Sequence, residues 1–553
     1  MLEKNQPFSV YNRAPSRWTS YVFNHFTLIG VLVLYILLSH LDISFHQAPP
    51  KKQNVIFMVT DGMGPASLSL ARSFRQHRDN LPIGDILALD KFLVGLSRTR
   101  SSSSLVTDSA AGATAFSCGL KSYNGAIGVD PNKNPCGTIL EALKLQGWHT
   151  GLVVTTRITD ATPAAFSSHV DYRFQEDLIA EQQLGGYPLG RMVDLILGGG
   201  RCHFLPQSAG GCRADSRNLV EEAKEGNWSY VENRADFDAL AGGENVSLPL
   251  LGLLAQTDIP YDIDRNASEY PSLAEQVKTA LTALSKATEN SDHGFFLLIE
   301  GSRIDHAGHH NDPAAQVREV LAYDEAFKEV LSFIDNSDVE TVAISTSDHE
   351  TGGLVTSRQV SKSYPDYIWY PQVLLNSTHS GDYLASKIVS AKQSNIFKDD
   401  ESFSDFIAKS IFEQDLGIYD YTQREIYTVK KLANIQSELM YFLNNMVSIR
   451  SRTGWTTHGH SAVDVNIYAY SNSKRIDELL YQRDPYTGLL GNHENIEIGS
   501  FMESLTHVDL KKVTELVRKT HHSPGAMAEA QVDSLHVAAM GEQHSGCMQN
   551  SKN

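Results

Sequence analysis

Five short apolar runs, separated by helical patterns, constrain the fold of this chain more than any other feature of its sequence. Each run is rich in apolar and β-branched residues, which is typical of strands buried on both faces of a mainly parallel sheet. The runs cover residues 54–60 (NVIFMVT), 150–156 (TGLVVTT), 294–299 (GFFLLI), 341–346 (TVAIST) and 463–470 (VDVNIYAY). Between them, residues 312–334 predict a helix with Asp312 as its N-cap and Pro313 at its first position. This alternation predicts an α/β fold, a three-layer sandwich around a large, mainly parallel central sheet.

Polar motifs follow the first four of these runs. In chain order they are DGMG, TRITDATPAAF, EGSRIDHAGHH and SDHETGG. Ligand sites in open α/β sheets form at the carboxyl ends of the strands. We therefore expect the four motifs to meet at one edge of the sheet.

The acidic and imidazole side chains of these motifs predict a centre that holds several metal ions. Asp61 alone is more typical of a turn than of a metal ligand, and the pair Asp348 and His349 alone leaves a metal site and a structural role equally open. Four strand-end groups that all offer Asp, Glu or His favour a shared centre, where carboxylate and imidazole together suit zinc, and carboxylate with hydroxyl suits magnesium. The candidate ligands are Asp61, Glu300, Asp305, His309, Asp348, His349 and either His458 or His460, which precede the last strand.

The net charge of −18 excludes a typical nucleic-acid binder, because a phosphate backbone is bound by clustered Lys and Arg. Bound divalent cations reverse the local field, so an acidic protein can still hold an anionic substrate. The charge is thus consistent with a metal centre.

Ser109 is the candidate nucleophile, in the segment TDSAAGATAF. At a helix N-terminus the backbone N–H groups and the helix dipole favour an arriving phosphate, and small neighbouring residues leave room for metals and substrate. On its local context alone, Ser109 is more typical of a helix cap than of a nucleophile.

Taken together and in this order, the motifs resemble those of alkaline phosphatases. The resemblance rests on DGMG, TDSAAGATA, DATPAAF followed by Arg173, EGSRIDHAGHH, SDHETGG and GHS, and it covers about residues 54–471. The chain is similar in style to the vacuolar, repressible members of that family in fungi. The resemblance implies the alkaline phosphatase fold with insertions, and hydrolysis of small phosphate monoesters to an alcohol and inorganic phosphate through a phosphoserine at Ser109. It also implies two zinc ions and one magnesium ion per site, broad phosphate scavenging in the vacuole, and a homodimer.

The resemblance further implies a role for each matching residue. Arg173 would bind two phosphate oxygens, and Asp108 would help to orient it. Asp160 and His306 would flank the third metal site. Counted back from Asp464, His460 and not His458 has the family's spacing. The implied ligands are Asp305, His309 and His460 for the first zinc, Asp61, Asp348 and His349 for the second, and Asp61, Thr162 and Glu300 for magnesium.

Two other interpretations stay open from the sequence. A phosphodiesterase, sulfatase or phosphomutase of the same broad architecture would use related metal chemistry. A catalytically inactive glycoprotein with an adhesive or scaffolding role would be expected to lack ligands, and none is visibly missing. Comparing hydrolysis of a monoester, a diester and a sulfate ester separates the enzymes.

An apolar segment at residues 22–41 predicts an uncleaved signal anchor, with a cleaved signal peptide as the alternative. Lys4, Arg13 and Arg17 precede it, which favours a cytoplasmic N-terminus and a single-pass type II topology. The resemblance to the vacuolar members of the family implies the vacuole membrane as the location. We expect a cytoplasmic tail (1–21), the anchor (22–41), a linker (42–53), a lumenal catalytic domain (54–520) with an insertion at about 357–453, and a disordered or removed tail (521–553).

Lumenal exposure would allow glycosylation and disulfide formation. The short loops between Cys118 and Cys136, and between Cys202 and Cys212, suit disulfides, with buried free thiols as the alternative. The candidate glycosylation acceptors are Asn227, Asn245, Asn266 and Asn376.

Overall fold

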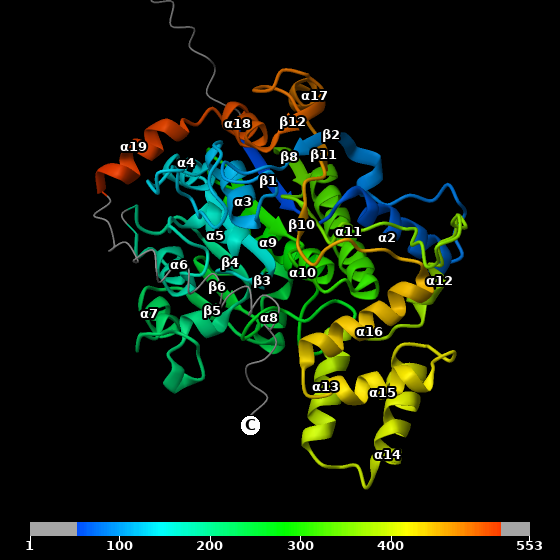
Figure 1. Cartoon of the computed structure of the whole chain (residues 1–553). Helices are drawn as coiled ribbons and strands as arrows, with labels where there is room; N and C mark the ends of the chain where they lie inside the picture. Colours follow the sequence, from blue (N-terminus) through cyan, green and yellow to red (C-terminus); the bar gives the residue numbers. More distant parts are fainter. Residues whose placement is uncertain (1–51, 188, 521–553) are drawn as a thin grey trace, which may run out of the picture. The chain divides into compact units, whose positions relative to one another are not determined.

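A ten-stranded sheet forms the centre of the computed structural model, which describes residues 52–187 and 189–520. Its strand order is β12-β2-β11-β8-β1-β7-β3-β4-β6-β5 (Figure 1). Strand β11 runs antiparallel to both β8 and β2, and the other neighbouring pairs are parallel. The strands are β1 (Gln53–Val59), β2 (Leu93–Arg98), β3 (His149–Arg157), β4 (Leu195–Gly199), β5 (Ser229–Val231), β6 (Leu250–Leu253), β7 (Phe295–Glu300), β8 (Glu340–Thr346), β11 (Val465–Ser471) and β12 (Gly491–Glu494).

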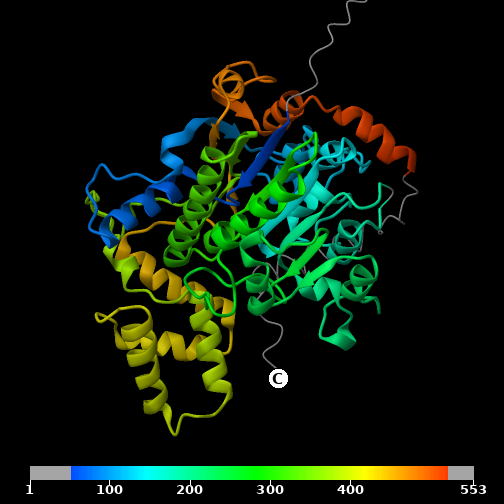
Figure 2. The same ribbon diagram turned by 180° about the vertical axis from the view of Figure 1, so that it is seen from behind.

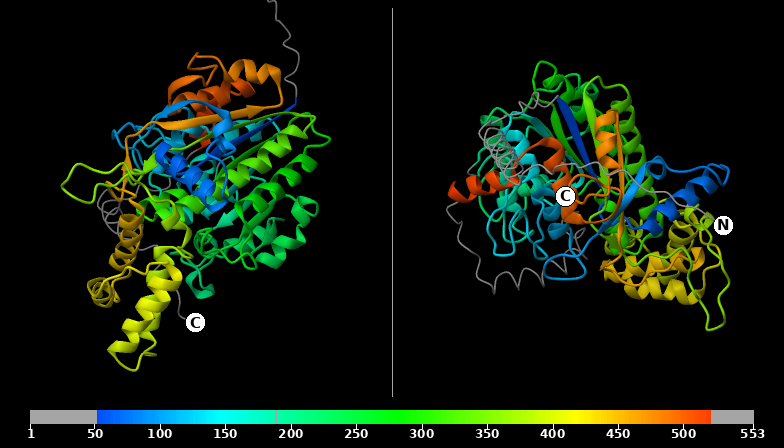
Figure 3. Two further views of the ribbon diagram at one scale, coloured as in Figure 1. Left: turned by 90° about the vertical axis from the view of Figure 1, so that its right-hand side faces the viewer. Right: turned by 90° about the horizontal axis from the view of Figure 1, so that it is seen from above.

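Helices cover both faces of this sheet (Figures 1, 2 and 3). One face carries α2 (Pro65–Arg78), α9 (Leu273–Ala287) and α11 (Pro313–Asp335). The other carries α3 (Ser109–Cys118), α4 (Ile139–Leu145), α18 (Asn495–Thr506) and α19 (Leu510–Thr520). The remaining helices near the sheet are α5 (Ala161–Ser167), α6 (Glu176–Gln183), α7 (Leu219–Glu225), α8 (Arg234–Ala239), α10 (Arg303–His309) and α17 (Lys474–Leu480).

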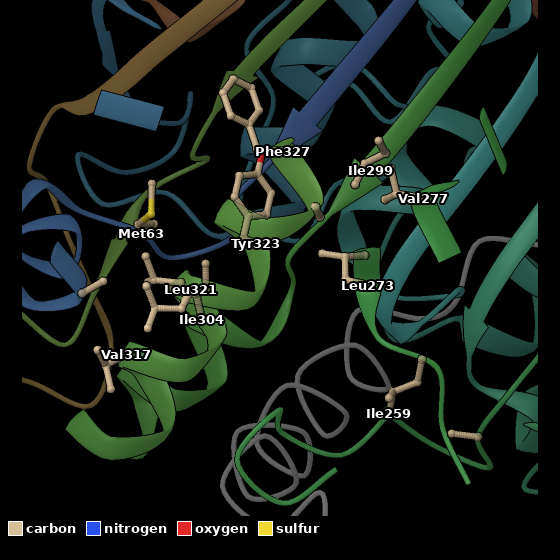
Figure 4. Close-up of a cluster of buried hydrophobic side chains, with 14 of the residues drawn as sticks. Met63, Ile259, Leu273, Val277, Ile299, Ile304, Val317, Leu321, Tyr323 and Phe327 are labelled. Carbon is tan, nitrogen blue, oxygen red and sulfur yellow. The ribbon is translucent and has the colours of Figure 1, made fainter. Parts of the chain in front are cut away.

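The central strands are buried on both faces, which explains why they are apolar without alternation. In β1, Ile56 and Met58 belong to one core, and Val55, Phe57 and Val59 belong to the other, because successive side chains of a strand point to opposite faces. Figure 4 shows part of the first core, with Tyr323 and Phe327 of α11, Ile299 of β7 and Val277 of α9 among its side chains. The three-layer α/β sandwich predicted from the sequence is confirmed.

The five predicted strands correspond to β1, β3, β7, β8 and β11, and their ends differ from the prediction by at most two residues. Helix α11 also forms where predicted, and the Asp312 carboxylate accepts hydrogen bonds from the backbone N–H groups of Ala314 and Ala315. The sequence did not reveal β2, β4, β5, β6 and β12. Four of these are edge strands or neighbours of an edge, and β4 lies next to β6. All but β2 have only three to five residues, so too few apolar residues follow one another to give a pattern.

Residues 357–453 lie between two short strands, β9 (Glu350–Thr351) and β10 (His460–Ser461), and are largely helical. Helix α16 packs against α13 and α11, which connects this segment to the first core. Its helices are α12 (Gln372–Leu375), α13 (Gly381–Gln393), α14 (Asp400–Asp405), the π-helix η5 (Phe406–Asp415), α15 (Gln423–Leu432) and α16 (Gln436–Ser451).

Both predicted disulfides form, Cys118 with Cys136 and Cys202 with Cys212. Among the described residues, no helix combines the length and the apolar character needed to cross a membrane. The predicted anchor at 22–41 and the predicted tails at 1–21 and 521–553 lie outside the described residues.

Candidate metal and phosphate site

Four neighbouring strands, in the order β8-β1-β7-β3, bring the predicted motifs together at one edge of the sheet. Each of these strands ends at that edge because all four are parallel. Strand β11 is antiparallel, so it begins there, and this direction places the preceding residues 458–460 beside the other motifs. The pairing of β10 with β9 fixes His460 opposite Thr351.

The first candidate metal cluster consists of Asp305, His309 and His460, whose ligand atoms all lie within 4.8 Å of one another. Nε2 of His460 lies 3.1 Å from Nε2 of His309. Each imidazole uses its other nitrogen as a donor: Nδ1 of His460 donates to the Thr107 carbonyl at 2.8 Å, and Nδ1 of His309 donates to the His458 carbonyl. In the neutral rings, both Nε2 atoms are acceptors that face each other and the Asp305 carboxylate, an arrangement that a cation would stabilise. Burial and the neighbouring His349 lower the pKa of His460 to about 3, so this ring is neutral and available as a ligand.

The second cluster consists of Asp61, Asp348 and His349, again with ligand atoms within 4.8 Å of one another. Oδ1 of Asp61 and Oδ2 of Asp348 are buried and accept no hydrogen bond from the residues that the structure describes. They lie 3.5 Å and 3.2 Å from Nε2 of His349. Burial, and then the charge of Asp348, raise the pKa of Asp61 well above its ordinary value. Buried acceptor oxygens without donors are costly, so these residues fit a bound cation.

Glu300 and Thr162 form the third group of predicted ligands. Glu300 ends β7, and its carboxylate accepts a hydrogen bond from the Ser302 hydroxyl at 2.6 Å. Burial raises the pKa of Glu300 to about 8, against the opposing effect of the Ser302 and Thr162 hydroxyls. Glu300 also contributes to the raised pKa of Asp61, which links this group to the second cluster.

Ser109 lies at the first position of α3, with its side chain against the second cluster. Its Oγ is 3.1 Å from Nε2 of His349, and the residue is 2% exposed. The interpretation of Ser109 as a helix cap is wrong, because the Asp108 carboxylate caps α3 by accepting from the backbone N–H of Ala111. The serine hydroxyl is therefore free of a capping role and points to the candidate metal ligands.

Arg173 lies across the site between two carboxylates. Its Nη1 is 3.4 Å from Oδ2 of Asp108, and its Nη2 donates to Oδ1 of Asp160 at 2.9 Å. The backbone N–H of Arg173 donates to the Gly125 carbonyl at 2.9 Å, which holds the loop that carries it. The guanidinium is thus oriented before any ligand arrives.

Comparisons with known proteins identify the family. The alkaline phosphatase family model matches residues 52–508. This chain belongs to the alkaline phosphatase family. Members of the family hydrolyse phosphate monoesters and depend on metal ions, so the chain is a phosphatase.

Two yeast alkaline phosphatases and one solved structure illustrate the similarity. The chain is 58% identical to the repressible alkaline phosphatase of Saccharomyces cerevisiae over 523 residues, which is 92% of this chain and 91% of the relative. It is 48% identical to the alkaline phosphatase of Schizosaccharomyces pombe over 514 residues, 91% of each chain. The cold-active alkaline phosphatase of a psychrophilic Shewanella species superposes with a TM-score of 0.67 at 32% identity, over 82% of this chain and 99% of that one.

Two histidines of the alkaline phosphatase motifs, His458 and His306, lie beside the two metal clusters and are not part of them. Nδ1 of His458 donates to the His309 carbonyl at 2.8 Å, so His458 helps to hold the backbone of the candidate ligand His309. His306 faces Asp258, with 3.7 Å between Nδ1 and Oδ2. Asp160, the other predicted neighbour of the third site, contacts Arg173 and Arg157.

Sequence reasoning missed three residues that support this phosphatase site. The Thr351 hydroxyl donates to the Asp305 carboxylate. Arg157 and Asp258 form an ion pair at 2.8 Å beside Asp160. Arg157 lies within the TRITDATPAAF motif, and a charged residue at the end of a buried strand was a usable signal, whereas no motif surrounds Asp258.

Proposed function

We propose that Ser109 is the nucleophile that accepts the phosphoryl group of a phosphate monoester in this phosphatase. The observation that carries this proposal is the position of Ser109 Oγ, 3.1 Å from His349 in the second cluster and at the N-terminus of α3. The Ser109 oxygen would bond to phosphorus as the bond to the alcohol oxygen breaks. Water would then release inorganic phosphate and restore the serine.

The donor sets suit two zinc ions and one magnesium ion. The proposed ligands are Asp305, His309 and His460 for the first zinc, Asp61, Asp348 and His349 for the second, and Asp61, Thr162 and Glu300 for magnesium. Carboxylate with imidazole is typical of zinc, and carboxylate with hydroxyl oxygen is typical of magnesium. When bound, these cations would supply Lewis-acid activation of the attacking oxygen and charge neutralisation at the phosphate and the leaving oxygen.

The chain's own residues bind and orient the phosphate. The backbone N–H groups and dipole of α3 attract the anion at Ser109. Arg173 would donate to two phosphate oxygens in a fork, and Asp108 and Asp160 hold its guanidinium in place for this contact.

The test is the substitution Ser109→Ala, with Ser117→Ala as the matched control in the same helix. Ser117 is also buried, and removing its hydroxyl leaves the candidate ligands untouched. We expect Ser109→Ala to lower kcat by at least about a thousandfold with unchanged zinc and magnesium content, and Ser117→Ala to stay within about threefold. Incubation of wild-type protein with labelled phosphate at low pH and denaturation should trap phosphoserine at Ser109. Turnover that persists in Ser109→Ala, or a preference for diesters or sulfate esters over monoesters, would refute the proposal.

We further propose a single-pass type II protein of the vacuole membrane that scavenges phosphate as a homodimer. The apolar segment at 22–41, the two disulfides and the family resemblance support this setting. The four candidate glycosylation acceptors, Asn227, Asn245, Asn266 and Asn376, are all exposed. Protease protection in intact vacuoles tests the topology, removal of N-glycans tests the acceptors, and light scattering of the detergent-solubilised protein tests the dimer. Cytosolic exposure of the catalytic domain would refute the topology.

A further inference from the structure

Arg157, the last residue of β3, contacts three carboxylates that come from different parts of the chain. Its Nε donates to Glu176 at 2.9 Å, its Nη1 donates to Asp258 at 2.8 Å, and its Nη2 lies 3.3 Å from Oδ2 of Asp160. Its side chain is 21% exposed. Burial alone would lower the pKa of Arg157, but the three carboxylates raise it well above its ordinary value, so Arg157 is a permanent cation.

Two of these carboxylates fix the position of the Arg157 guanidinium. Oδ1 of Asp258 also accepts from the backbone N–H of Arg157 at 3.0 Å. Oε2 of Glu176 also accepts from the Thr159 hydroxyl at 2.5 Å, and it lies 3.2 Å from Nε2 of His203. The guanidinium is thus held from two sides, by α6 and by the loop at residue 258.

The third carboxylate, Asp160, connects Arg157 to the phosphate site. Its two oxygens face different arginines: Oδ2 faces Arg157, and Oδ1 accepts from Arg173 at 2.9 Å. Oδ1 also accepts from the backbone N–H of Ala161 at 2.7 Å. An Asp160 side chain without Arg157 would keep its backbone contact but would lose the partner that fixes its second oxygen.

We propose that Arg157 is a positioning residue for phosphate binding, which acts through Asp160 to hold the guanidinium of Arg173 in its binding orientation. The inference rests on the proposed role of Arg173 as the phosphate clamp. A long side chain such as Arg173 loses conformational freedom when it binds a ligand, so a preformed orientation strengthens binding. Arg157 itself does not touch the phosphate in this scheme.

A double-mutant cycle separates positioning from general structural support. The variants are Arg157→Met, Asp160→Asn, the combination of both, and Arg157→Lys, measured in the full-length, metal-loaded protein. The readouts are the inhibition constant of inorganic phosphate, equilibrium binding of radiolabelled phosphate, kcat, and zinc and magnesium content.

We expect Arg157→Met to weaken phosphate binding about tenfold and to change kcat by a smaller factor. In the Asp160→Asn background, Arg157→Met should weaken phosphate binding by less than about a further twofold. Arg157→Lys should be intermediate, because one ammonium group keeps the charge but cannot reproduce three fixed contacts. Full additivity in the cycle, wild-type phosphate affinity in Arg157→Lys, or a loss of affinity that follows a loss of bound metal would each overturn the proposal.

Arg75→Met is the matched control for removing a largely buried guanidinium that contacts carboxylates. The Arg75 side chain is 12% exposed; its Nε donates to Asp85 at 3.1 Å, and its Nη1 lies 3.6 Å from Oδ2 of Asp324. This variant should lower the melting temperature without changing phosphate affinity. An equal loss of phosphate affinity in Arg75→Met would contradict a specific role for Arg157.

Arg173→Ala distinguishes failure of this inference from failure of the proposed function. If Arg173→Ala weakens phosphate binding and Arg157→Met does not, the positioning role is wrong and the clamp stands. If Arg173→Ala leaves phosphate binding unchanged, the clamp itself is wrong.

Discussion

Glu319 on α11 is a buried acid that the proposed chemistry does not use. It is 5% exposed, and its Oε1 accepts a hydrogen bond from the backbone N–H of Asp262 at 2.6 Å. Burial, followed by the charge of Asp262, raises the pKa of Glu319 from 4.5 to about 7. The folded state therefore binds a proton more tightly at this residue than the unfolded chain does.

This shift predicts a pH-dependent effect of Glu319→Gln on stability. Between the unfolded pKa of 4.5 and the folded pKa of about 7, the native state binds more protons, so the free energy of unfolding falls as pH rises through this window. The glutamine amide cannot ionise. The change in the free energy of unfolding caused by Glu319→Gln should therefore be about 1–3 kcal/mol more stabilising at pH 8 than at pH 4.5. Denaturant unfolding at both pH values measures the difference. Glu325→Gln, at an exposed acid on the same helix, is the control variant and is measured at the same two pH values. Equal effects of Glu319→Gln at both pH values would contradict the buried-acid interpretation.

Individual site residues were predictable where their chemistry is local in the sequence. Asp348 and His349 are adjacent, and Asp305 and His309 are one helical turn apart, so short motifs reveal them. Two of the three carboxylate partners of Arg157 come 19 and 101 residues after it, and only the fold brings them together. The Ser109 hydroxyl could not be distinguished from a cap locally, because a serine at this position satisfies both patterns.

At the scale of elements, α3 must approach the candidate metal ligands closely. A Cβ at Gly112 would lie 3.0 Å from the Asp348 Cβ, which is tighter than ordinary contact. Glycine in a helix interior normally costs about 1 kcal/mol relative to alanine, so its presence in α3 reflects this approach. The small residues of TDSAAGATA thus fit the space between α3 and the end of β8.

Gly112→Ala should therefore lower activity more than stability. The added methyl group would displace α3 from Asp348 by a few tenths of an ångström and disturb the position of Ser109, and we expect kcat/KM to fall by about tenfold. The gain in helix propensity should offset much of the strain, so the melting temperature should change by only a few degrees. Ala115→Gly in the same helix provides the opposite pattern, a lower melting temperature with nearly unchanged kcat/KM. Wild-type activity in Gly112→Ala would show that the close approach is not required.

The predicted elements were those with long, continuous patterns. Helix α11 has 23 residues, and its buried apolar side chains recur with the helical period. The central strands are continuous apolar runs, as in β1. The antiparallel direction of β11 was not predictable, because a strand's apolar run does not show which way it pairs. That direction is what brings His460 to the site edge.

At the scale of the whole molecule, the net charge is −18, and several carboxylates lie together at one edge of the sheet. Repulsion between these carboxylates has to be compensated in the folded state. Asp61, Glu300, Asp305 and Asp348 are all buried, and Asp348, Asp305 and Glu300 each raise the pKa of Asp61. Like charges in a desolvated site oppose folding unless cations compensate them. Metal binding should therefore contribute to the stability of the fold as well as to catalysis.

Removal of divalent cations by excess EDTA should abolish monoester hydrolysis and lower the melting temperature by about 5 °C or more, because cations that bind only the folded state stabilise it by mass action. Differential scanning calorimetry and activity assays on the same samples measure both effects. Zinc together with magnesium should restore both, and EDTA saturated with zinc beforehand is the control for effects of the chelator itself. Ser109→Ala should lose the same number of degrees with EDTA as the wild type, since it keeps every proposed ligand. A melting temperature that does not respond to EDTA while activity is lost would mean that the carboxylate cluster is compensated by the protein alone.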